Sequence, residues 1–153
     1  MNIYLDLDGV IFQTLPLEEY NKKDCFSKTV LKKGALCFIK DLKEIGEVFI
    51  VSKTMFPSDN PKTPYQMRDK YVWALKLGFD LSHSFVLPSD RSKATICKDG
   101  ILIDDYSKNC EDAVLAIQIF EKKKKPWITA KNFQETLKKL RLIKSAIVYG
   151  GVI

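Results

Sequence analysis

The chain has 153 residues, of which 46% are hydrophobic and 29% are charged. This profile is typical of one compact globular domain with its own core, and it leaves too little chain for two full domains. The formal net charge of +6 indicates a surface that attracts anions, whether nucleotides or nucleic acid. Much of this charge comes from lysine runs at 122–125 and near the C-terminal end, which are usual at solvated helix ends.

The first half of the sequence alternates strand and helix patterns. Residues 2–7 are dense in Ile, Tyr and Leu, as in a strand buried on both faces, and they run into a glycine turn. Apolar residues at helical spacing predict a helix over about 30–45 that ends at a glycine. A β-rich strand follows at 47–52. After a turn-rich loop, helical periodicity returns over 65–77 and again stops at a glycine.

The second half continues this alternation. Residues 84–87 and 100–104 (GILID) predict the third and fourth strands, and an amphipathic pattern predicts a helix over about 107–121. Residues 126–129 predict a fifth strand, and a closing helix over 132–142 begins with the N-cap residue Asn132.

Strands that alternate with helices predict an α/β protein. We expect a Rossmann-like three-layer α/β/α fold with a mostly parallel central sheet, formed by a single domain over 1–153. The segment at about 11–30 is the one sizeable insertion, and we predict that it forms a small cap or lid. In such folds the loops at the carboxyl ends of the strands gather into one crevice, where the functional site is expected.

Two acidic residues, Asp6 and Asp8, follow the first predicted strand and lead into Gly9. One carboxylate of such a pair can attack phosphorus as a nucleophile, while its neighbour protonates the leaving oxygen and later activates water. Taken alone, the pair is more often a turn or a helix cap.

A second acidic pair, Asp104 and Asp105, follows the apolar strand at 101–103 and should emerge at the same edge of the sheet. Four carboxylates that converge on one crevice repel one another and stay ionised only with a cation. Oxygen ligands of this kind suit Mg²⁺, which can also neutralise charge during phosphoryl transfer. The four acids together therefore predict a Mg²⁺ site.

Two further polar residues lie at positions from which they could hold phosphate oxygens. Ser52 ends the second predicted strand, and Lys93 lies in the loop before the fourth. Taken singly, a serine at a strand end is usually a cap and a loop lysine is usually solvated. Their order relative to the two acidic pairs favours a hydroxyl and an ammonium group at the phosphate.

The successive stretches DLDGV, FIVS, SK and ILIDD resemble the four motifs of haloacid dehalogenase-type phosphatases. This resemblance implies that Asp6 is the nucleophile and Asp8 the general acid and base. It also implies that Ser52 and Lys93 hold the phosphate. The residues that it implies for the metal site are Asp6, Asp8 through its backbone carbonyl, Asp104 and Asp105.

A narrower resemblance links the stretch PYQMRDKYVWALKLG, at 64–78, to a helix of the 5′(3′)-deoxyribonucleotidases of the same superfamily. The stretch at 91–93 is similar to an arginine-x-lysine motif of that family. The resemblance implies that Lys70 and Arg91 are additional phosphate or substrate contacts and that Lys53 contacts substrate beside Ser52. It covers about residues 2–110, and relatives have a longer helical cap between the first two motifs.

Three functions follow as alternatives. The first is a Mg²⁺-dependent phosphomonoesterase that forms an aspartyl-phosphate and acts on nucleoside monophosphates, as a 5′-nucleotidase does. The second keeps this chemistry but acts on another small phosphorylated metabolite or on a nucleic-acid end, which the positive net charge would attract. The third is a binding or regulatory domain that has the same fold without turnover.

Composition also bears on where the protein works. The N-terminal stretch has no basic leader or cleavage site of a secretory signal, and no apolar run approaches the length of a membrane span. The cysteines are far apart and contain no CxxC pair, so we expect free thiols in a cytoplasmic protein without a membrane partner. They are Cys25, Cys37, Cys97 and Cys110.

Overall fold

The computed structural model of the chain describes residues 1–121 and 125–150. Within these ranges six strands form one sheet in the order β3-β2-β1-β4-β5-β6, and all neighbouring strands are parallel. The predicted Rossmann-like α/β fold is therefore confirmed. The strands are β1 (Asn2–Leu5), β2 (Glu47–Lys53), β3 (Ser84–Leu87), β4 (Gly100–Asp104), β5 (Ala116–Ile119) and β6 (Ile128–Ala130).

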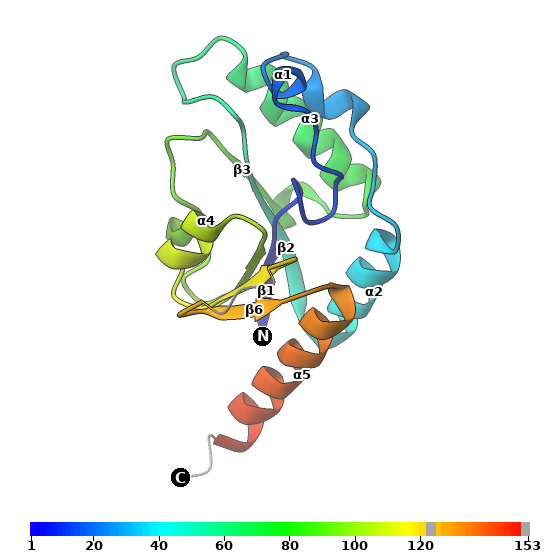
Figure 1. The fold of residues 1–153 in the computed structure, drawn as a ribbon, viewed down its shortest axis with the longest axis vertical. Coiled ribbons are helices and arrows are strands. Elements are labelled where there is room, and N and C mark those ends of the chain that lie inside the picture. Colours follow the sequence, from blue (N-terminus) through cyan, green and yellow to red (C-terminus); the bar gives the residue numbers. More distant parts are fainter. Residues whose placement is uncertain (122–124, 151–153) are drawn as a thin grey trace.

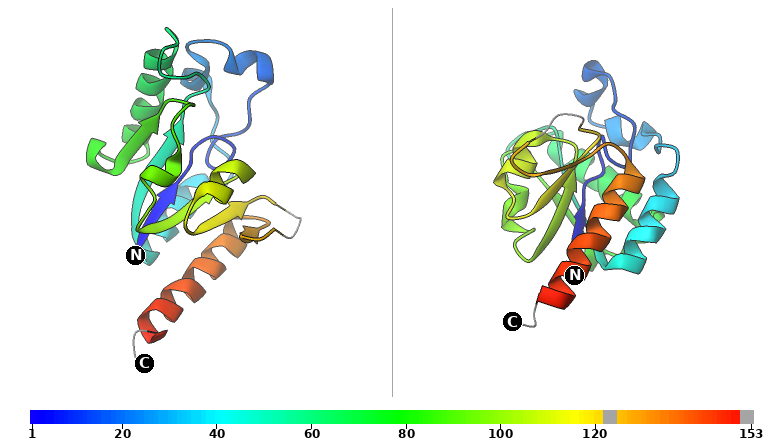
Figure 2. Two further views of the ribbon diagram at one scale, coloured as in Figure 1. Left: turned by 90° about the vertical axis from the view of Figure 1, so that its left-hand side faces the viewer. Right: turned by 60° about the horizontal axis from the view of Figure 1, so that its bottom comes forward.

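Helices cover both faces of the sheet, which gives the three expected layers (Figure 1). On one face α2, α3 and α5 pack over the main apolar core, and α2 and α5 lie side by side (Figure 2). The other face carries α4, η3 and a smaller apolar cluster around Tyr4 and Leu102. The helices are α1 (Leu17–Tyr20), α2 (Ala35–Ile45), α3 (Thr63–Lys76), α4 (Ser107–Asp112) and α5 (Phe133–Gly150), with 3₁₀ turns η1 (Cys25–Lys28), η2 (Leu81–His83) and η3 (Lys93–Thr95).

The strand order reverses direction at the centre of the sheet. The chain proceeds outward from β1 through β2 to β3, and then returns to pair β4 with the other edge of β1. In open parallel sheets a crevice opens at such a switch point, outside the carboxyl ends of the two central strands. The functional site is therefore expected among the residues that follow β1 and β4.

The predicted helix over 107–121 is wrong in its second half. Helix α4 ends at Asp112, the backbone becomes extended at Ala113, and residues 116–119 form β5 instead. All four side chains of β5 are buried, because it pairs with strands on both sides and is covered on both faces. A short apolar run without alternation has no period that distinguishes a buried strand from a helix.

The closing helix is longer than predicted, although its start is confirmed. The Asn132 side-chain Oδ1 accepts a hydrogen bond from the Glu135 backbone N–H at 2.9 Å, as an N-cap does. Helix α5 then continues to Gly150, and its last turns extend beyond the sheet (Figure 1). In the lysine run at 122–125, residues 122–124 lie outside the described residues. Among the helices described, none combines the length and apolar character needed to cross a membrane.

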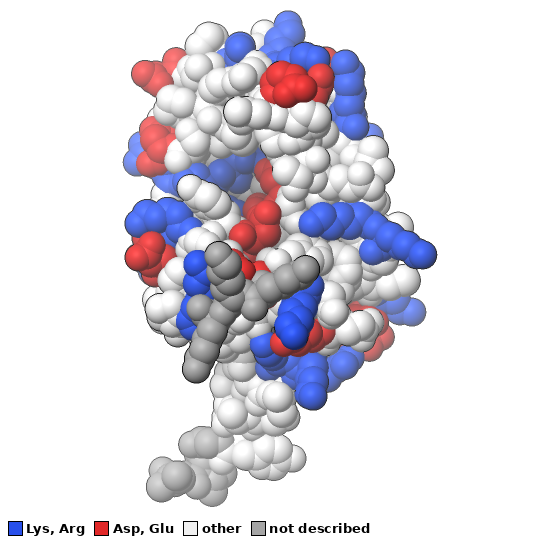
Figure 3. Space-filling model, in the orientation of Figure 1, with Lys and Arg blue, Asp and Glu red and all other residues white. Residues whose placement is uncertain are grey.

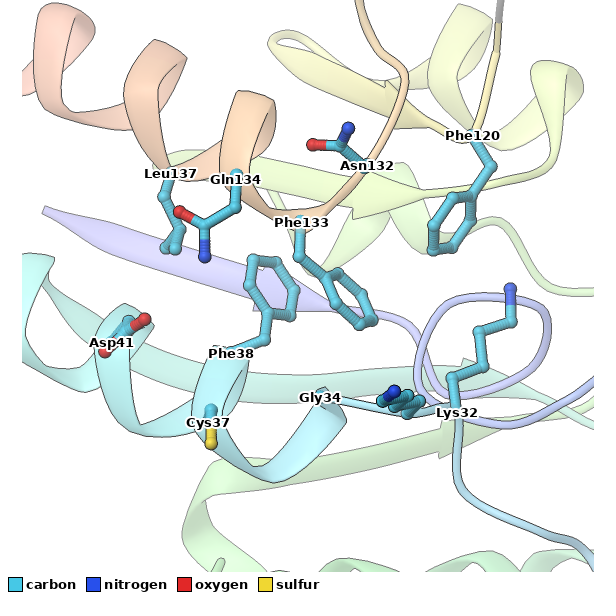
Figure 4. A pocket seen from close by; sticks show the side chains of 11 residues that line it. Lys32, Gly34, Cys37, Phe38, Asp41, Phe120, Asn132, Phe133, Gln134 and Leu137 are labelled. Atoms are coloured by element: carbon cyan, nitrogen blue, oxygen red, sulfur yellow. The ribbon is translucent and has the colours of Figure 1, made fainter.

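Two stacked aromatic rings join α2 to α5. Phe38 on α2 is 2% exposed, and its ring stacks on that of Phe133 with 4.2 Å between the ring centroids (Figure 4). Phe120, which directly follows β5, meets the Phe133 ring edge-on. Such aromatic contacts add to the free energy gained by burying the apolar area itself.

We expect Phe38→Ala to lower the free energy of unfolding by about 3–5 kcal/mol, because the substitution leaves a cavity in the core. Urea denaturation would measure this loss. Leu36→Ala is the matched control, because Leu36 lies on the same helix but is 60% exposed, and it should change stability by about 0.5 kcal/mol or less. Equal effects of the two substitutions would contradict the packing of α2 on α5.

Candidate active site

The register of the two central strands brings the two acidic pairs together. Leu5 at the end of β1 lies opposite Ile103 of β4, and the Asp6 backbone N–H donates to the Ile103 carbonyl oxygen at 3.0 Å. Asp6 and Asp104 are therefore neighbours at the carboxyl edge of the sheet. Both side chains are buried, with exposed fractions of 5% and 0%.

Three carboxylates converge there. Asp6, Asp104 and Asp105 each offer one oxygen, and these oxygens lie within 4.8 Å of one another. The buried Asp6 Oδ1 is paired with Lys93 Nζ at 2.8 Å but accepts no well-formed hydrogen bond from the described residues. Hard oxygen donors at this spacing, one of them without a well-formed hydrogen bond, fit the requirements of Mg²⁺.

The Asp105 carboxyl is affected by the repulsion between the three carboxylates. Burial, and then the nearby carboxylates of Asp6 and Asp104, raise the pKa of the Asp105 carboxyl to about 7. A divalent cation between the three carboxylates would remove this repulsion and favour the ionised form.

A buried lysine partly compensates the acids. Lys93, in η3, forms ion pairs with Asp6 Oδ1 at 2.8 Å and with Asp104 Oδ2 at 2.6 Å. Burial lowers the pKa of Lys93, but Asp104 and Asp6 outweigh this effect, and the pKa is raised overall. Asp104 also accepts hydrogen bonds from the Asn109 side chain at 3.0 Å and from the Tyr106 backbone N–H at 2.8 Å. Asp104 is thereby held in one orientation.

The turn after Asp8 requires glycine. Gly9 has φ +67°, which L side chains rarely adopt, and a Cβ atom there would overlap the carboxylate of Asp105. The Lys32 ammonium group donates to the Gly9 carbonyl oxygen and lies 3.8 Å from the Phe120 ring centroid. The turn therefore lies directly against Asp105.

Asp8 belongs to a second buried network. Its Oδ2 accepts from the ammonium group of Lys70, and the Ser52 hydroxyl lies 3.4 Å from the same oxygen. Lys70 also donates to Ser52 Oγ at 2.8 Å. Burial raises the pKa of the Asp8 carboxyl, while Lys70 opposes that shift. The Asp8 side chain retains an exposed fraction of 24%, so it still faces the cavity.

A cavity of about 470 Å³ opens over these residues. In Figure 3 acidic side chains lie in a hollow of the visible face, with Lys and Arg side chains on both sides of it. The predicted site residues that line the cavity are Asp6, Asp8, Lys53, Lys93 and Asp105. The other lining residues, which sequence reasoning missed, are Gly9, Thr14, Tyr20, Thr54, Met55, Ser89, Tyr106 and Asn109.

Four predicted site residues do not line this cavity. Ser52 and Lys70 have no exposed surface and lie beside Asp8, while Asp104 is buried under Lys93 and Asn109. Arg91 is exposed in the loop after β3. The structure thus brings Ser52, Lys70 and Asp104 into contact with cavity residues but leaves Arg91 outside the group.

The segment predicted as a cap contributes Thr14 and Tyr20 to the cavity and is attached to α3. The Gln66 side chain donates to the Tyr20 carbonyl oxygen at 3.2 Å, and Trp73 Nε1 donates to the Phe26 carbonyl oxygen at 2.7 Å. Membership of the 11–30 segment is the one sequence signal that could have identified Thr14 and Tyr20. Met55, Tyr106 and Asn109 follow strands or lie in α4 and carry no such signal.

No protein-family model matches this sequence, and no curated protein matches it. Solved structures do resemble it. An uncharacterized protein from Listeria monocytogenes serotype 4b has a TM-score of 0.63 at 14% identity, with 95% of this chain and 99% of that chain covered. D,D-heptose 1,7-bisphosphate phosphatase from Burkholderia thailandensis has a TM-score of 0.56 at 12% identity, with coverages of 92% and 97%. At these identities the likeness shows the shared Rossmann-like fold alone.

The raised pKa of Asp105 predicts a pH-dependent stability without metal. The folded carboxyl stays protonated up to about pH 7, whereas in the unfolded chain it ionises near pH ~4. The folded state therefore binds more protons in this window, and stability falls as the pH rises through it. In EDTA, Tm should fall between about pH 5 and about pH 7 more steeply in the wild type than in Asp105→Asn.

Mg²⁺ should raise Tm at neutral pH in the wild type but much less in Asp105→Asn, because ligands that bind only the folded state stabilise it. Asp59→Asn is the control, since Asp59 is exposed in the loop before α3 and outside the cavity. Differential scanning fluorimetry measures both effects. An Asp105→Asn variant with the wild-type pH slope and Mg²⁺ response would contradict the assignment of this residue to a metal site.

Proposed function

We propose that this protein is a Mg²⁺-dependent phosphomonoesterase of the haloacid dehalogenase superfamily that acts on nucleoside monophosphates in the cytoplasm. The observation that carries the proposal is the convergence of Asp6, Asp104 and Asp105 within 4.8 Å, with Asp8 lining the same cavity. Because the acids come from two segments distant in the sequence, ordinary turn or cap roles do not account for their meeting. Four free thiols are consistent with a reducing compartment.

Asp6, Asp104 and Asp105 would hold the cation, together with the backbone carbonyl of Asp8. When bound, Mg²⁺ would neutralise negative charge on the phosphoryl oxygens during transfer. The chain supplies the rest of the chemistry. Lys93 holds Asp6 and Asp104 in place through its two ion pairs, so neither carboxylate must reorient when substrate arrives.

Asp6 is the proposed nucleophile. A carboxylate oxygen of Asp6 attacks phosphorus, the bond between phosphorus and the ester oxygen breaks, and an aspartyl-phosphate forms. Asp8 gives its proton to the departing ester oxygen, which leaves as an alcohol. Burial raises the pKa of the Asp8 carboxyl, which favours the protonated form that a general acid needs.

The second half of the reaction restores the enzyme. Asp8, now a carboxylate, takes a proton from a water molecule that attacks the phosphorus of the aspartyl-phosphate. The bond between phosphorus and the Asp6 oxygen breaks, and inorganic phosphate leaves. The same residue therefore acts first as the acid and then as the base.

Lys53 is the proposed contact for the phosphate. It lines the cavity and forms no ion pair with any described residue, whereas Lys93 is engaged by two carboxylates. Burial, and then the proximity of Lys93, lower the pKa of Lys53. A bound phosphate dianion would relieve this repulsion between the two ammonium groups.

The cavity lining favours a substrate with a planar apolar part. Tyr20, Met55 and Tyr106 line the same cavity as the acids, and Met55 and Tyr106 have exposed fractions of 43% and 63%. Aromatic faces of this kind can stack on a nucleobase. The resemblance of residues 64–78 to a nucleotidase helix supports the same substrate class.

Asp6→Asn tests the mechanism directly. The wild type should release inorganic phosphate from nucleoside monophosphates with Mg²⁺ and not in EDTA, while Asp6→Asn should lose about 1,000-fold or more in kcat, because the amide cannot act as the nucleophile. Asp59→Asn, outside the cavity, should retain activity. Equal phosphate release by Asp6→Asn and the wild type would refute this mechanism.

A substrate panel tests the substrate class. It should contain nucleoside and deoxynucleoside 5′- and 3′-monophosphates, end-phosphorylated oligonucleotides, and sugar bisphosphates, since a phosphatase of a heptose bisphosphate has a similar fold. The highest kcat/KM on mononucleotides would support the proposal. A preference for oligonucleotide ends or sugar phosphates would keep the chemistry and replace the substrate, and no turnover on any of them would favour a non-catalytic binding domain.

Lys53→Met should raise KM and lower kcat/KM by about tenfold or more, because a charge-assisted hydrogen bond to phosphate is lost. Steady-state kinetics with the best substrate of the panel measure this change. Lys40→Met serves as the control, since Lys40 is exposed on α2 and lies outside the cavity. Unchanged kinetics in Lys53→Met would remove Lys53 from the phosphate site.

A further inference from the structure

Lys70 is a lysine with no exposed surface, in the middle of α3. A buried ammonium group is stable only if its charge is paired and its hydrogen bonds are made. Lys70 meets both conditions when the Asp8 carboxyl is ionised, because Asp8 then supplies the opposite charge and two further oxygens accept hydrogen bonds. The surrounding residues therefore satisfy both the charge and the hydrogen-bonding groups of this buried side chain.

All donors of Lys70 are already used inside the protein. An ammonium group has three N–H donors, and Nζ donates to Asp8 Oδ2, to Ser52 Oγ at 2.8 Å and to the Lys53 carbonyl oxygen. The fourth side is closed by the ring of Phe26, whose centroid lies 4.0 Å from Nζ. Lys70 has no donor left for a phosphate and does not line the cavity.

These contacts connect three segments of the chain that surround the site. Asp8 follows β1, while Ser52 and the Lys53 carbonyl end β2. Phe26 belongs to η1, in the segment that forms part of the cavity wall. Helix α3 therefore contacts the residues after β1, the end of β2 and η1 through one side chain. Of the groups around the Asp8 carboxylate, Lys70 is the only cation in direct contact within the described residues, and the Ser52 hydroxyl is at the limit of a hydrogen bond at 3.4 Å.

We infer that Lys70 is a positioning residue that orients the Asp8 carboxyl toward the leaving oxygen of the substrate. The inference rests on the proposed function and replaces the sequence-based assignment of Lys70 as a substrate contact. Lys70 holds Asp8 Oδ2, whereas the other oxygen of the carboxyl, Oδ1, accepts no hydrogen bond from Lys70, and the Asp8 residue lines the cavity. Without Lys70 the carboxyl can rotate, and proton transfer to the leaving oxygen loses its fixed geometry.

The test uses the dependence of the reaction on the leaving group. Glycerol 2-phosphate has an alkoxide leaving group that needs a proton, whereas 4-nitrophenyl phosphate has a stabilised phenolate that needs little protonation. Lys70→Met should therefore lower kcat/KM far more for glycerol 2-phosphate than for 4-nitrophenyl phosphate. Because general acid catalysis contributes about 10²–10⁴-fold, we expect the ratio of the two kcat/KM values to fall by about tenfold or more.

The ratio of the two kcat/KM values remains informative even if the substitution lowers the fraction of folded protein. Both substrates are measured on one preparation, so a lower folded fraction changes the two kcat/KM values equally. If Lys70→Met does not fold, Lys70→Gln is measured in the same way, since it retains a neutral donor. Lys76→Met is the matched control, because Lys76 is an exposed lysine on the same helix, 5.0 Å from the Trp73 ring centroid; its ratio should equal that of the wild type.

The outcomes separate this inference from the proposed function. A wild type that hydrolyses neither these two substrates nor any member of the substrate panel refutes the function, and the inference falls with it. An active wild type together with an unchanged ratio in the folded Lys70 variant refutes the inference alone, because a merely structural lysine would slow both substrates equally. A large rise in KM for both substrates, with the ratio unchanged, would instead restore Lys70 as a substrate contact.

Discussion

Everything in this site depends on how the protein keeps four carboxylates together where two neighbouring strands end. Like charges cannot share a buried space unless cations compensate them. Two buried lysines divide this task, with Lys93 between Asp6 and Asp104, and Lys70 against Asp8. Asp105 contacts neither lysine, and its raised pKa marks the charge that the chain leaves uncompensated. A divalent cation would complete the balance.

The two faces of the sheet contribute differently to the site. One face carries three helices and most of the core, and the other carries α4 and a smaller apolar cluster. Helix α3 belongs to the first face but also serves the site, because its side chains hold the segment around Tyr20 and Phe26 and, through Lys70, the carboxyl of Asp8. The segment at 11–30 thus forms a wall of the cavity and contributes Thr14 and Tyr20 to its lining.

Particular residues show which features of the site sequence patterns can predict and which they cannot. The order of the acidic pairs relative to buried strands was enough to place Asp6 beside Asp104, because parallel strands end at a common edge. The same reasoning placed Ser52 at the phosphate, and the resemblance to a nucleotidase helix placed Lys70 there, yet both are buried next to Asp8 and do not line the cavity. Sequence spacing indicates the edge of the sheet at which a side chain emerges but not whether it lies above or beneath its neighbours. Strand β5 was missed because an apolar run buried on both faces has no diagnostic period.

The sequence by itself determined the alternation of strands and helices, the parallel sheet, and the edge at which the acids gather, since these follow from local periodicity, glycine positions and chain connectivity. Only the tertiary structure decided which lysine pairs with which carboxylate, which of the polar residues reach the cavity, and that Tyr20 and Tyr106 line it. The reason is physical. Backbone patterns are set by residues a few positions apart, whereas burial and ion pairing depend on side chains that meet only after the crossovers have folded.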